Sequence, residues 1–247
     1  MRARLLGLSP DGIEELDFEE EVELATYVPD AVVEDVLHAF PGAVAQPLDE
    51  GWEDAWRAFH QPVEVGGLWV GPPWEDAPAR GKAVVIDPGR AFGTGGHPTT
   101  RLALELLAER PERGSLLDVG CGSGVLAIAA ARLGFGPVHA VDLDPIAVET
   151  TIENAKVNGV ELEVSVADAA NDVLPAADVA TVNVLLRPVE RILRRLDTKV
   201  AITSGYLDGE RPSHAGWVHD RHLAADGWAA DAFLRRTGAN RLPSATV

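Results

Sequence analysis

Residues 116–133 constrain the fold of this chain more than any other stretch. A short apolar run leads into a turn with glycine at alternate positions, and an apolar, helix-forming segment follows at once. The glycines of the turn are Gly120, Gly122 and Gly124. This succession is typical of the strand, tight turn and helix that begin a βαβ unit. Because glycine has no Cβ, the backbone can turn sharply and a ligand can approach it closely. The sequence therefore predicts an α/β fold with a ligand site at this turn, in preference to an ordinary strand-helix connection.

The spacing of the glycines separates this turn from that of a dinucleotide-binding fold. Val125 stands where such a fold places its third glycine, so a nicotinamide-dependent oxidoreductase is disfavoured. The form Asp118-x-Gly-x-Gly-x-Gly resembles instead the first motif of class I methyltransferases, which use S-adenosylmethionine. The resemblance implies that Asp118 and the three glycines, Gly120, Gly122 and Gly124, contribute to a cofactor site.

A second acidic residue follows the turn at the spacing at which nucleotide-binding folds place a ribose-binding carboxylate. The apolar run 138–141 ends in Asp142, about twenty positions beyond the glycines, where a carboxylate can hold both ribose hydroxyls of a nucleoside. We expect Asp142 to anchor the ribose, because the glycine turn at this spacing disfavours a merely solvated strand end. Asp144 and Pro145 then suit the N-cap and the first position of the next helix.

Length, charge and cysteine content narrow the class of protein. The 247 residues suffice for one large domain, or for a large and a small one. A net charge of −18 disfavours nucleic acid and anionic membranes as partners and suits a basic protein, although solubility alone is an alternative explanation. There is no apolar stretch of about 18 residues and no basic-then-apolar leader, so we expect a cytoplasmic protein. We also expect a monomer. The single cysteine, Cys121, excludes an intrachain disulfide and suits packing better than nucleophilic catalysis.

The first 80 residues divide by composition into two parts. Residues 1–48 are expected to form a small α+β domain, and residues 49–80, rich in Trp, Pro and Gly, a linker whose aromatic side chains pack on the main domain. An exposed aromatic recognition surface is the alternative interpretation of the linker. Residues 81–247 would hold the cofactor. The elements expected here are the end of a helix at 3–8, strands at 22–28, 42–48 and 68–70, and a helix through Phe40.

A second glycine-rich loop precedes the turn. After an expected strand at 83–87, the chain reads Pro88-Gly89-Arg90-Ala91-Phe92-Gly93-Thr94-Gly95-Gly96-His97-Pro98-Thr99-Thr100. The Gly-Lys-Ser/Thr ending of a phosphate loop is missing, which excludes that motif. The form Phe-Gly-Thr-Gly-x-His-x-Thr-Thr after Pro-Gly resembles the signature loop of bacterial ribosomal protein L11 methyltransferases of the PrmA type. The resemblance implies that the loop covers the site and that Thr100 lies against the cofactor, although Thr99 or Thr100 can also begin the helix at 101–108.

The rest of the chain alternates between apolar runs and amphipathic segments. This pattern predicts a doubly wound, mostly parallel, seven-stranded Rossmann-like methyltransferase sheet, preceded by the small N-terminal α+β domain. The expected helices are 125–133, 146–157, 186–196 and a short one after Leu207; the expected strands are 116–119, 138–142, 161–166, 178–183, 200–205, 217–224 and 228–234.

The resemblance covers essentially the whole chain and supplies further site residues. Asn183-Val184-Leu185 stands where the family carries Asn-Ile-Leu. The family's N-terminal domain usually begins with a strand that the sequence does not predict here, which bears on docking of the protein substrate more than on cofactor binding. The resemblance implies Asn183 as the catalytic residue and as a cofactor contact, together with Phe92, Thr94, His97, Thr100, Leu143 and Asp168.

Asn183 suits methyl transfer to an amine. Its amide oxygen can accept a hydrogen bond from the attacking nitrogen, although an Asx-turn at the strand end is the alternative. A lysine amine has a pKa near 10.4 and must lose its proton to react; a neutral acceptor in a dry pocket lowers that pKa by desolvation, whereas a carboxylate would raise it. We therefore expect no general base, and we expect His97 either to contact the site or to shape its loop.

A metal site is not expected. His219 and His222 are three apart on an expected strand, so their side chains should point to opposite faces, and the cysteines of a zinc site are missing.

The function expected from all of this is methyl transfer from S-adenosylmethionine to lysine ε-amines of ribosomal protein L11, with the N-terminal amine as a further acceptor. The partner would be the free, basic L11 protein, without direct contact to nucleic acid. Two alternatives remain: a class I methyltransferase acting on another protein or a small-molecule amine, and a cofactor-binding protein that has lost catalysis.

Overall fold

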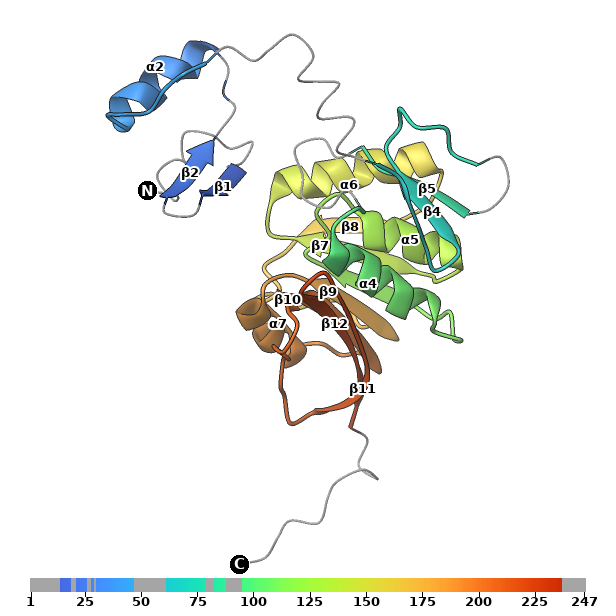
Figure 1. Cartoon of the computed structure of the whole chain (residues 1–247). Helices are drawn as coiled ribbons and strands as arrows, with labels where there is room; N and C mark the ends of the chain where they lie inside the picture. Colours follow the sequence, from blue (N-terminus) through green and yellow to red (C-terminus); the bar gives the residue numbers. More distant parts are fainter. Residues whose placement is uncertain are drawn as a thin grey trace, which may run out of the picture. The chain divides into compact units, whose positions relative to one another are not determined.

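The computed structural model describes residues 14–18, 21–25, 28, 30–46, 61–78, 82–87 and 95–236. The chain divides into two compact units, Met1–Trp56 and Arg57–Val247 (Figure 1). The predicted boundaries at 48 and 80 differ from this single division. Residues 61–78, predicted as part of a linker, form strands that belong to the larger unit.

The smaller unit is built from a hairpin and a helix. Strand β1 (Glu14–Phe18) pairs antiparallel with β2 (Glu21–Ala25), and α2 (Asp30–Ala39) follows. The sequence predicted β2 and α2 but missed β1. The strand expected at 42–48 is wrong over the described residues 42–46, where Gly42 adopts a φ of 106° after the helix and the backbone is irregular. The helix expected at 3–8, and any strand before it, lie outside the described residues.

The larger unit contains the predicted seven-stranded sheet, in the order β11-β12-β10-β9-β6-β7-β8. The five strands from β10 to β8 run parallel, and the β11–β12 hairpin adds two antiparallel strands at one edge. The strands are β6 (Leu116–Val119), β7 (Val138–Asp142), β8 (Glu163–Val166), β9 (Val179–Asn183), β10 (Val200–Leu207), β11 (Trp217–Ala225) and β12 (Trp228–Arg235). The fold class is confirmed.

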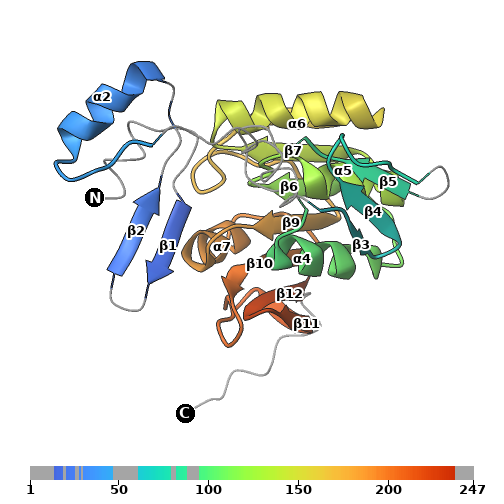
Figure 2. The same cartoon turned by 45° about the horizontal axis from the view of Figure 1, so that its top comes forward.

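Helices cover both faces of this sheet, and the central strand β6 explains why (Figure 2). Successive strand residues point to opposite faces. Leu116 joins the core that contains residues of α4 and α5, whereas Leu117 joins the core that contains Leu193 of α7. A strand buried on both faces needs a continuous apolar run, which residues 116–119 provide apart from Asp118. The helices are α4 (Pro98–Ala108), α5 (Val125–Leu133), α6 (Pro145–Asn158) and α7 (Leu186–Leu193).

A second, three-stranded sheet packs on the first core. Strand β4 (Leu68–Gly71) pairs antiparallel with β3 (Val63–Val65) and parallel with β5 (Lys82–Val85). The buried side chains of Leu68, Val70 and Val84 belong to the same core as α4 and α5. Apolar burial of this kind makes β3, β4 and β5 part of the folded unit, although proline and glycine are frequent between these strands.

Two smaller expectations are also resolved. Residues 208–216 contain turns and irregular backbone but no helix, so the short helix predicted after Leu207 is wrong. None of the helices in the described part of the chain has the length and apolar character needed to cross a membrane.

Candidate functional site

The glycine turn has the geometry that the sequence predicted. Gly120, Gly122 and Gly124 have φ angles of 73°, 54° and 83°, in the left-handed region that favours glycine. A Cβ on Gly120 would lie 2.6 Å from Val184 Cγ1, and one on Gly124 would lie 2.8 Å from Thr151 Cγ2. The turn is therefore enclosed by the protein at two of its glycines, and larger residues cannot replace them without displacing neighbours.

Asp142 lies beside this turn, as expected from the spacing. Its Oδ2 accepts a hydrogen bond from the Gly122 N–H at 2.9 Å, and its Oδ1 accepts one from the Asp144 N–H at 3.0 Å. Asp144 in turn caps α6, because its Oδ1 accepts a hydrogen bond from the Ile146 N–H at 2.9 Å. The carboxylate of Asp142 is thus fixed at the end of β7, next to the backbone of the glycine turn.

Asp118 lies inside the protein, below the turn. Its side chain belongs to a residue that is 1% exposed; Oδ1 accepts from the Thr181 hydroxyl at 2.7 Å and Oδ2 from the Ala127 N–H at 3.2 Å. Burial raises the pKa of Asp118 to about 7, against the opposing effect of these hydrogen bonds. The carboxyl group ties β6 to β9 and to the first turn of α5, so its described contacts support the shape of the turn.

Cys121 also faces the interior. The residue is 5% exposed, and its Sγ lies 3.3 Å from the Thr151 hydroxyl. Burial raises the pKa of the thiol to about 12, so the thiolate needed for nucleophilic attack does not form near neutral pH. The packing role predicted for Cys121 agrees with this environment.

Helix α6 holds the turn through polar residues that sequence reasoning missed. The Thr151 hydroxyl donates to the Gly122 carbonyl oxygen, and the Asn154 amide donates to the Ser123 carbonyl oxygen, both at 2.9 Å. Thr151 and Asn154 are both buried. The sequence did contain a signal for this role. The polar residues 151, 154 and 158 recur at helical spacing on one face, whereas a buried helix face is normally apolar.

The same helix fixes the strand that leads into the signature loop. Asn158 Oδ1 accepts from the Val85 N–H at 2.9 Å, and the Asn158 amide donates to the Val85 carbonyl oxygen at 2.6 Å. Asn154 contacts the N–H and the carbonyl of Asp87 in the same way, at 3.0 and 3.2 Å. Two of the predicted site residues farther along this loop, Phe92 and Thr94, lie outside the described residues.

His97 begins helix α4. Its Nδ1 accepts a hydrogen bond from the Thr99 N–H at 3.3 Å, and its ring packs edge-on against Trp228 of β12, with 5.0 Å between the ring centroids. Burial, followed by the charge of Arg101, lowers the pKa of His97 below its ordinary value. A neutral imidazole in this position suits the loop-shaping role that the sequence left as one of two alternatives.

Thr100 and Asn183 bring the two family motifs together. The Asn183 side-chain amide donates to the Thr100 hydroxyl oxygen at 3.3 Å. Thr100 is fully buried in the first turn of α4, and Asn183 ends strand β9. Because the amide nitrogen is used in this contact, the carbonyl oxygen of Asn183 points away from Thr100.

The remaining predicted residues lie at the carboxyl ends of neighbouring strands. Leu143 follows β7 and is 68% exposed. Asp168 follows β8; its Oδ1 accepts from the Ala170 N–H at 2.9 Å and its Oδ2 from the Asn171 amide at 2.6 Å, and these contacts hold the pKa of its carboxyl below the ordinary value. Ligands of open α/β sheets bind along this edge, so both residues stand where a cofactor contact is possible.

Gly205 is a position that sequence reasoning missed. It has a φ of 100°, and a Cβ placed there would collide with the backbone carbonyl of Val184. Val184 therefore lies between two glycines, Gly120 of the turn and Gly205 of β10. This close approach fixes the backbone that follows Asn183.

The comparisons with known proteins agree with this geometry. The family model described as Ribosomal protein L11 methyltransferase (PrmA) matches residues 17–232. A Ribosomal protein L11 methyltransferase of Geobacter sulfurreducens is 42% identical over 218 residues, which cover 80% of this chain and 71% of the relative. One of Caldicellulosiruptor bescii is 38% identical over 176 residues, which cover 67% of this chain and 57% of the relative. This chain thus spans little more than half of the second relative.

A solved structure extends the likeness to three dimensions. The crystal structure of ribosomal protein L11 methylase from Lactobacillus delbrueckii subsp. bulgaricus has a TM-score of 0.63 and 29% identity, and the match covers 69% of this chain and 96% of that one. The matched family model spans most of the chain and includes every predicted site residue. The chain belongs to the ribosomal protein L11 methyltransferase (PrmA) family.

Proposed function

We propose that this protein transfers methyl groups from S-adenosylmethionine to amines of ribosomal protein L11, at lysine ε-amines and at the N-terminal amine. The observation that carries the proposal is the hydrogen bond between Asn183 and Thr100, which joins the signature loop to the end of β9. Family membership supplies the class of reaction, and the names of the relatives supply the substrate.

The residues at the carboxyl edge of the sheet fit the cofactor. Gly122 has no Cβ to obstruct close approach to the backbone of the turn. Asp142 places a carboxylate 2.9 Å from the Gly122 nitrogen, where ribose hydroxyls can donate to its oxygens. Leu143 would cover the base, and Thr100 would close the site from α4. When bound, S-adenosylmethionine supplies an electrophilic methyl group on a positively charged sulfur.

Asn183 would select a neutral amine. Its carbonyl oxygen can accept one N–H of the acceptor nitrogen and so direct the lone pair of that nitrogen toward the methyl group. A carboxylate in this position would stabilise the ammonium form, but the nearby Asp118 is sealed in the interior at 1% exposed. His97 is occupied as the cap of α4. The chain would therefore lower the amine pKa by desolvation as the amine is enclosed, and the proton would pass to solvent water before methyl transfer.

The smaller unit would grip the protein substrate. Its hairpin carries acidic residues on both strands, and the whole chain has a net charge of −18. A chain of this charge would attract a free, lysine-rich ribosomal protein and repel the RNA-bound form. This recognition would take place in the cytoplasm, before the substrate is assembled into a ribosome.

The test is incubation of the purified full chain with labelled S-adenosylmethionine and free ribosomal protein L11, followed by mapping of the label. We expect the label on lysine ε-amines and on the N-terminal amine. Label on another protein of a ribosomal extract, with none on L11, would favour the second candidate, a methyltransferase with a different protein acceptor. That candidate is kept because the chain spans only 57% of one relative. Tight cofactor binding without label on any amine would contradict methyl transfer to amines altogether.

A further inference from the structure

His219 and His222 meet on one face of β11, contrary to the prediction that they point to opposite faces. The prediction assumed a regular strand, in which residues three apart alternate. The pairing register shifts between His219 and Arg221, where Asp220 is the additional residue. A bulge of this kind re-aims the side chains on one side of it. His222 pairs directly with Asp231 of β12.

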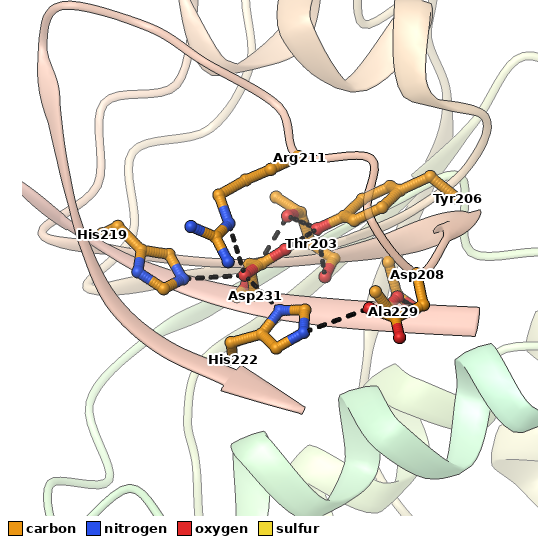
Figure 3. A network of polar contacts seen from close by, with 9 residues as sticks. Thr203, Tyr206, Asp208, Arg211, His219, His222, Ala229 and Asp231 are labelled. Atoms are coloured by element: carbon orange, nitrogen blue, oxygen red, sulfur yellow. Dashed lines mark hydrogen bonds and ion pairs between the residues drawn. The ribbon is translucent and has the colours of Figure 1, made fainter. Parts of the chain in front are cut away.

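The two histidine side chains converge on a single carboxylate oxygen of Asp231 (Figure 3). His219 Nε2 lies 2.7 Å from Asp231 Oδ1, and His222 Nδ1 lies 2.9 Å from the same atom. All three ligand atoms lie within 4.8 Å of one another. We propose that His219, His222 and Asp231 form a binding site for a divalent transition-metal ion, with Zn²⁺ as the ion that suits them best.

Two of the three separations are close to those that zinc requires, and the ligand atoms of the two histidines lie within 4.8 Å of each other. Zinc binds histidine nitrogen and carboxylate oxygen at about 2.0–2.2 Å, so a tetrahedral ion keeps its ligand atoms about 3.4 Å apart. The two short separations at Asp231 need to open by only several tenths of an ångström. Two imidazoles and one carboxylate are a ligand set that zinc accepts, with water in the fourth position.

The three ligands differ in exposure in a way that lets an ion enter from solvent. The Asp231 side chain is 0% exposed, whereas those of His219 and His222 are 33% and 31% exposed. The carboxylate thus forms the base of the site and the imidazoles its mouth. The His219 ring also packs edge-on against Phe233, with 5.5 Å between the centroids, which restricts its rotation.

Outer partners hold two of the three ligands in place. The Tyr206 hydroxyl donates to Asp231 Oδ2 at 2.9 Å, which leaves Oδ1 as the oxygen that faces the histidines. Asp208 Oδ1 lies 3.5 Å from His222 Nε2, on the side of the ring opposite to the ligand nitrogen. A carboxylate on the second nitrogen of a histidine is the usual outer partner in metal sites, because it orients the ring and increases its basicity.

Arg211 is the competitor for this site. Its Nε lies 3.3 Å from Asp231 Oδ1, so in the absence of a metal ion the guanidinium can balance the charge of this oxygen. The Arg211 side chain is 49% exposed and can withdraw into solvent. The two carboxylates, of Asp208 and Asp231, carry one more unit of charge than the single guanidinium of Arg211, which favours the entry of a further cation.

The site would tie the terminal hairpin together. Both histidines belong to β11, the edge strand, and Asp231 belongs to β12. An ion would therefore link the two strands at the edge of the sheet. The glycine turn and Asn183 contribute no ligand, so the inference does not depend on the proposed methyl transfer.

The test uses the full chain without an affinity tag. Calorimetry with Zn²⁺ should give one ion per chain, and Co²⁺ should give the visible absorption bands of a tetrahedral site with nitrogen and oxygen ligands. His219→Ala and His222→Ala should each weaken Zn²⁺ binding at least tenfold, and the double variant should abolish the Co²⁺ bands. His38→Ala removes an exposed histidine of α2 and should bind like the wild type.

Two further variants separate a metal site from a hydrogen-bond network. Arg211→Ala should bind Zn²⁺ more tightly, because the competing cation is gone, and Asp208→Asn should weaken binding roughly tenfold. Zn²⁺ should raise the melting temperature of the wild type but not of the double histidine variant. The proposal is overturned if the wild type takes up no ion, or if the double variant binds as tightly as the wild type. Circular dichroism of each variant shows whether the hairpin still folds, and β11, as an edge strand, tolerates such changes.

Discussion

The side-chain amide of Asn183 donates a hydrogen bond to the hydroxyl of Thr100, across 83 positions of sequence and 3.3 Å of space. This contact joins the start of α4 to the end of β9 and fixes which way the amide carbonyl points. Thr100 and Asn183 belong to the two sequence motifs that identify the family. The hydrogen bond shows that these two motifs, which are far apart in the sequence, are in contact in the folded chain.

Asn183→Asp should impair methyl transfer and change its pH dependence. The carboxylate is the same size as the amide, but it stabilises the ammonium form of the acceptor and so raises the amine pKa. We expect the rate at neutral pH to fall at least tenfold, and the pH profile of the rate to move to higher pH. Thr100→Val, which removes the hydroxyl but keeps the volume, should lower the rate about three- to tenfold with an unchanged profile. An unshifted profile for Asn183→Asp would contradict the role of a neutral acceptor.

Asp142→Ala should weaken S-adenosylmethionine binding by about 1.5–3 kcal/mol, the cost of a lost charge-assisted hydrogen bond. Asp144→Ala, two residues later, is the matched control. It removes the cap of α6 and should lower the free energy of unfolding by about 1 kcal/mol while cofactor affinity stays nearly the same. Calorimetry and chemical denaturation on both variants check this. Equal affinity of wild type and Asp142→Ala would remove Asp142 from the site.

Gly205→Ala should destabilise the protein more than Gly209→Ala does. Both glycines have a left-handed φ, 100° and 93°, so both substitutions carry backbone strain of roughly 1–2 kcal/mol. A Cβ on Gly209 meets no atom within 4 Å, whereas one on Gly205 collides with the carbonyl of Val184. The difference between the two free energies of unfolding isolates that collision. We expect Gly205→Ala alone to lower methyl-transfer activity as well, because Val184 follows Asn183.

Asp118→Asn should remove a pH dependence of stability. Burial raises the pKa of Asp118 from 3.8 to about 7, so between these values the folded chain holds a proton that the unfolded chain has released. Its stability therefore falls as the pH rises through this window, at up to about 1.4 kcal/mol per unit. The amide of the variant can still accept from Ala127 and donate to Thr181, but it does not titrate. Denaturation between pH 4 and 7 should show wild type losing stability relative to Asp118→Asn, whereas Asp144→Asn, an exposed change, should track the wild type.

Local sequence rules were sufficient for the glycine turn, for Asp142 beside it and for the order of helices and strands in the large sheet. Each of these depends on residues close in the sequence: the glycine spacing, the acid at a strand end, and apolar periodicity. The packing role of Cys121 could be predicted in the same way, because the residue lies inside the glycine turn, where only a small side chain fits. The resemblance to the family added Thr100 and Asn183, which local rules alone would not have paired.

What the sequence could not supply depends on contacts between distant segments. The bulge at Asp220 results from the way β11 pairs with β12, and no residue near Asp220 predicts a shift of register. Strands were predicted at 68–70 and 83–87, where β4 and β5 lie, but β3 was missed. The parallel pairing of β4 with β5, across a segment rich in proline and glycine, could not be predicted from either strand alone. The close approach of Gly205 to Val184 likewise joins two different strand ends.

The paired contacts of Asn154 and Asn158 with the backbone near β5 have a further consequence. Strand β5 is the last strand of its sheet, and Val85 turns its N–H and its carbonyl away from β4 and toward Asn158. One side-chain amide offers the same donor and acceptor pair that a neighbouring strand would offer. An open strand edge recruits other chains and leads to aggregation. Helix α6 thus occupies, beside Val85, the position that a foreign strand would take, and in the folded protein it closes this part of the sheet edge.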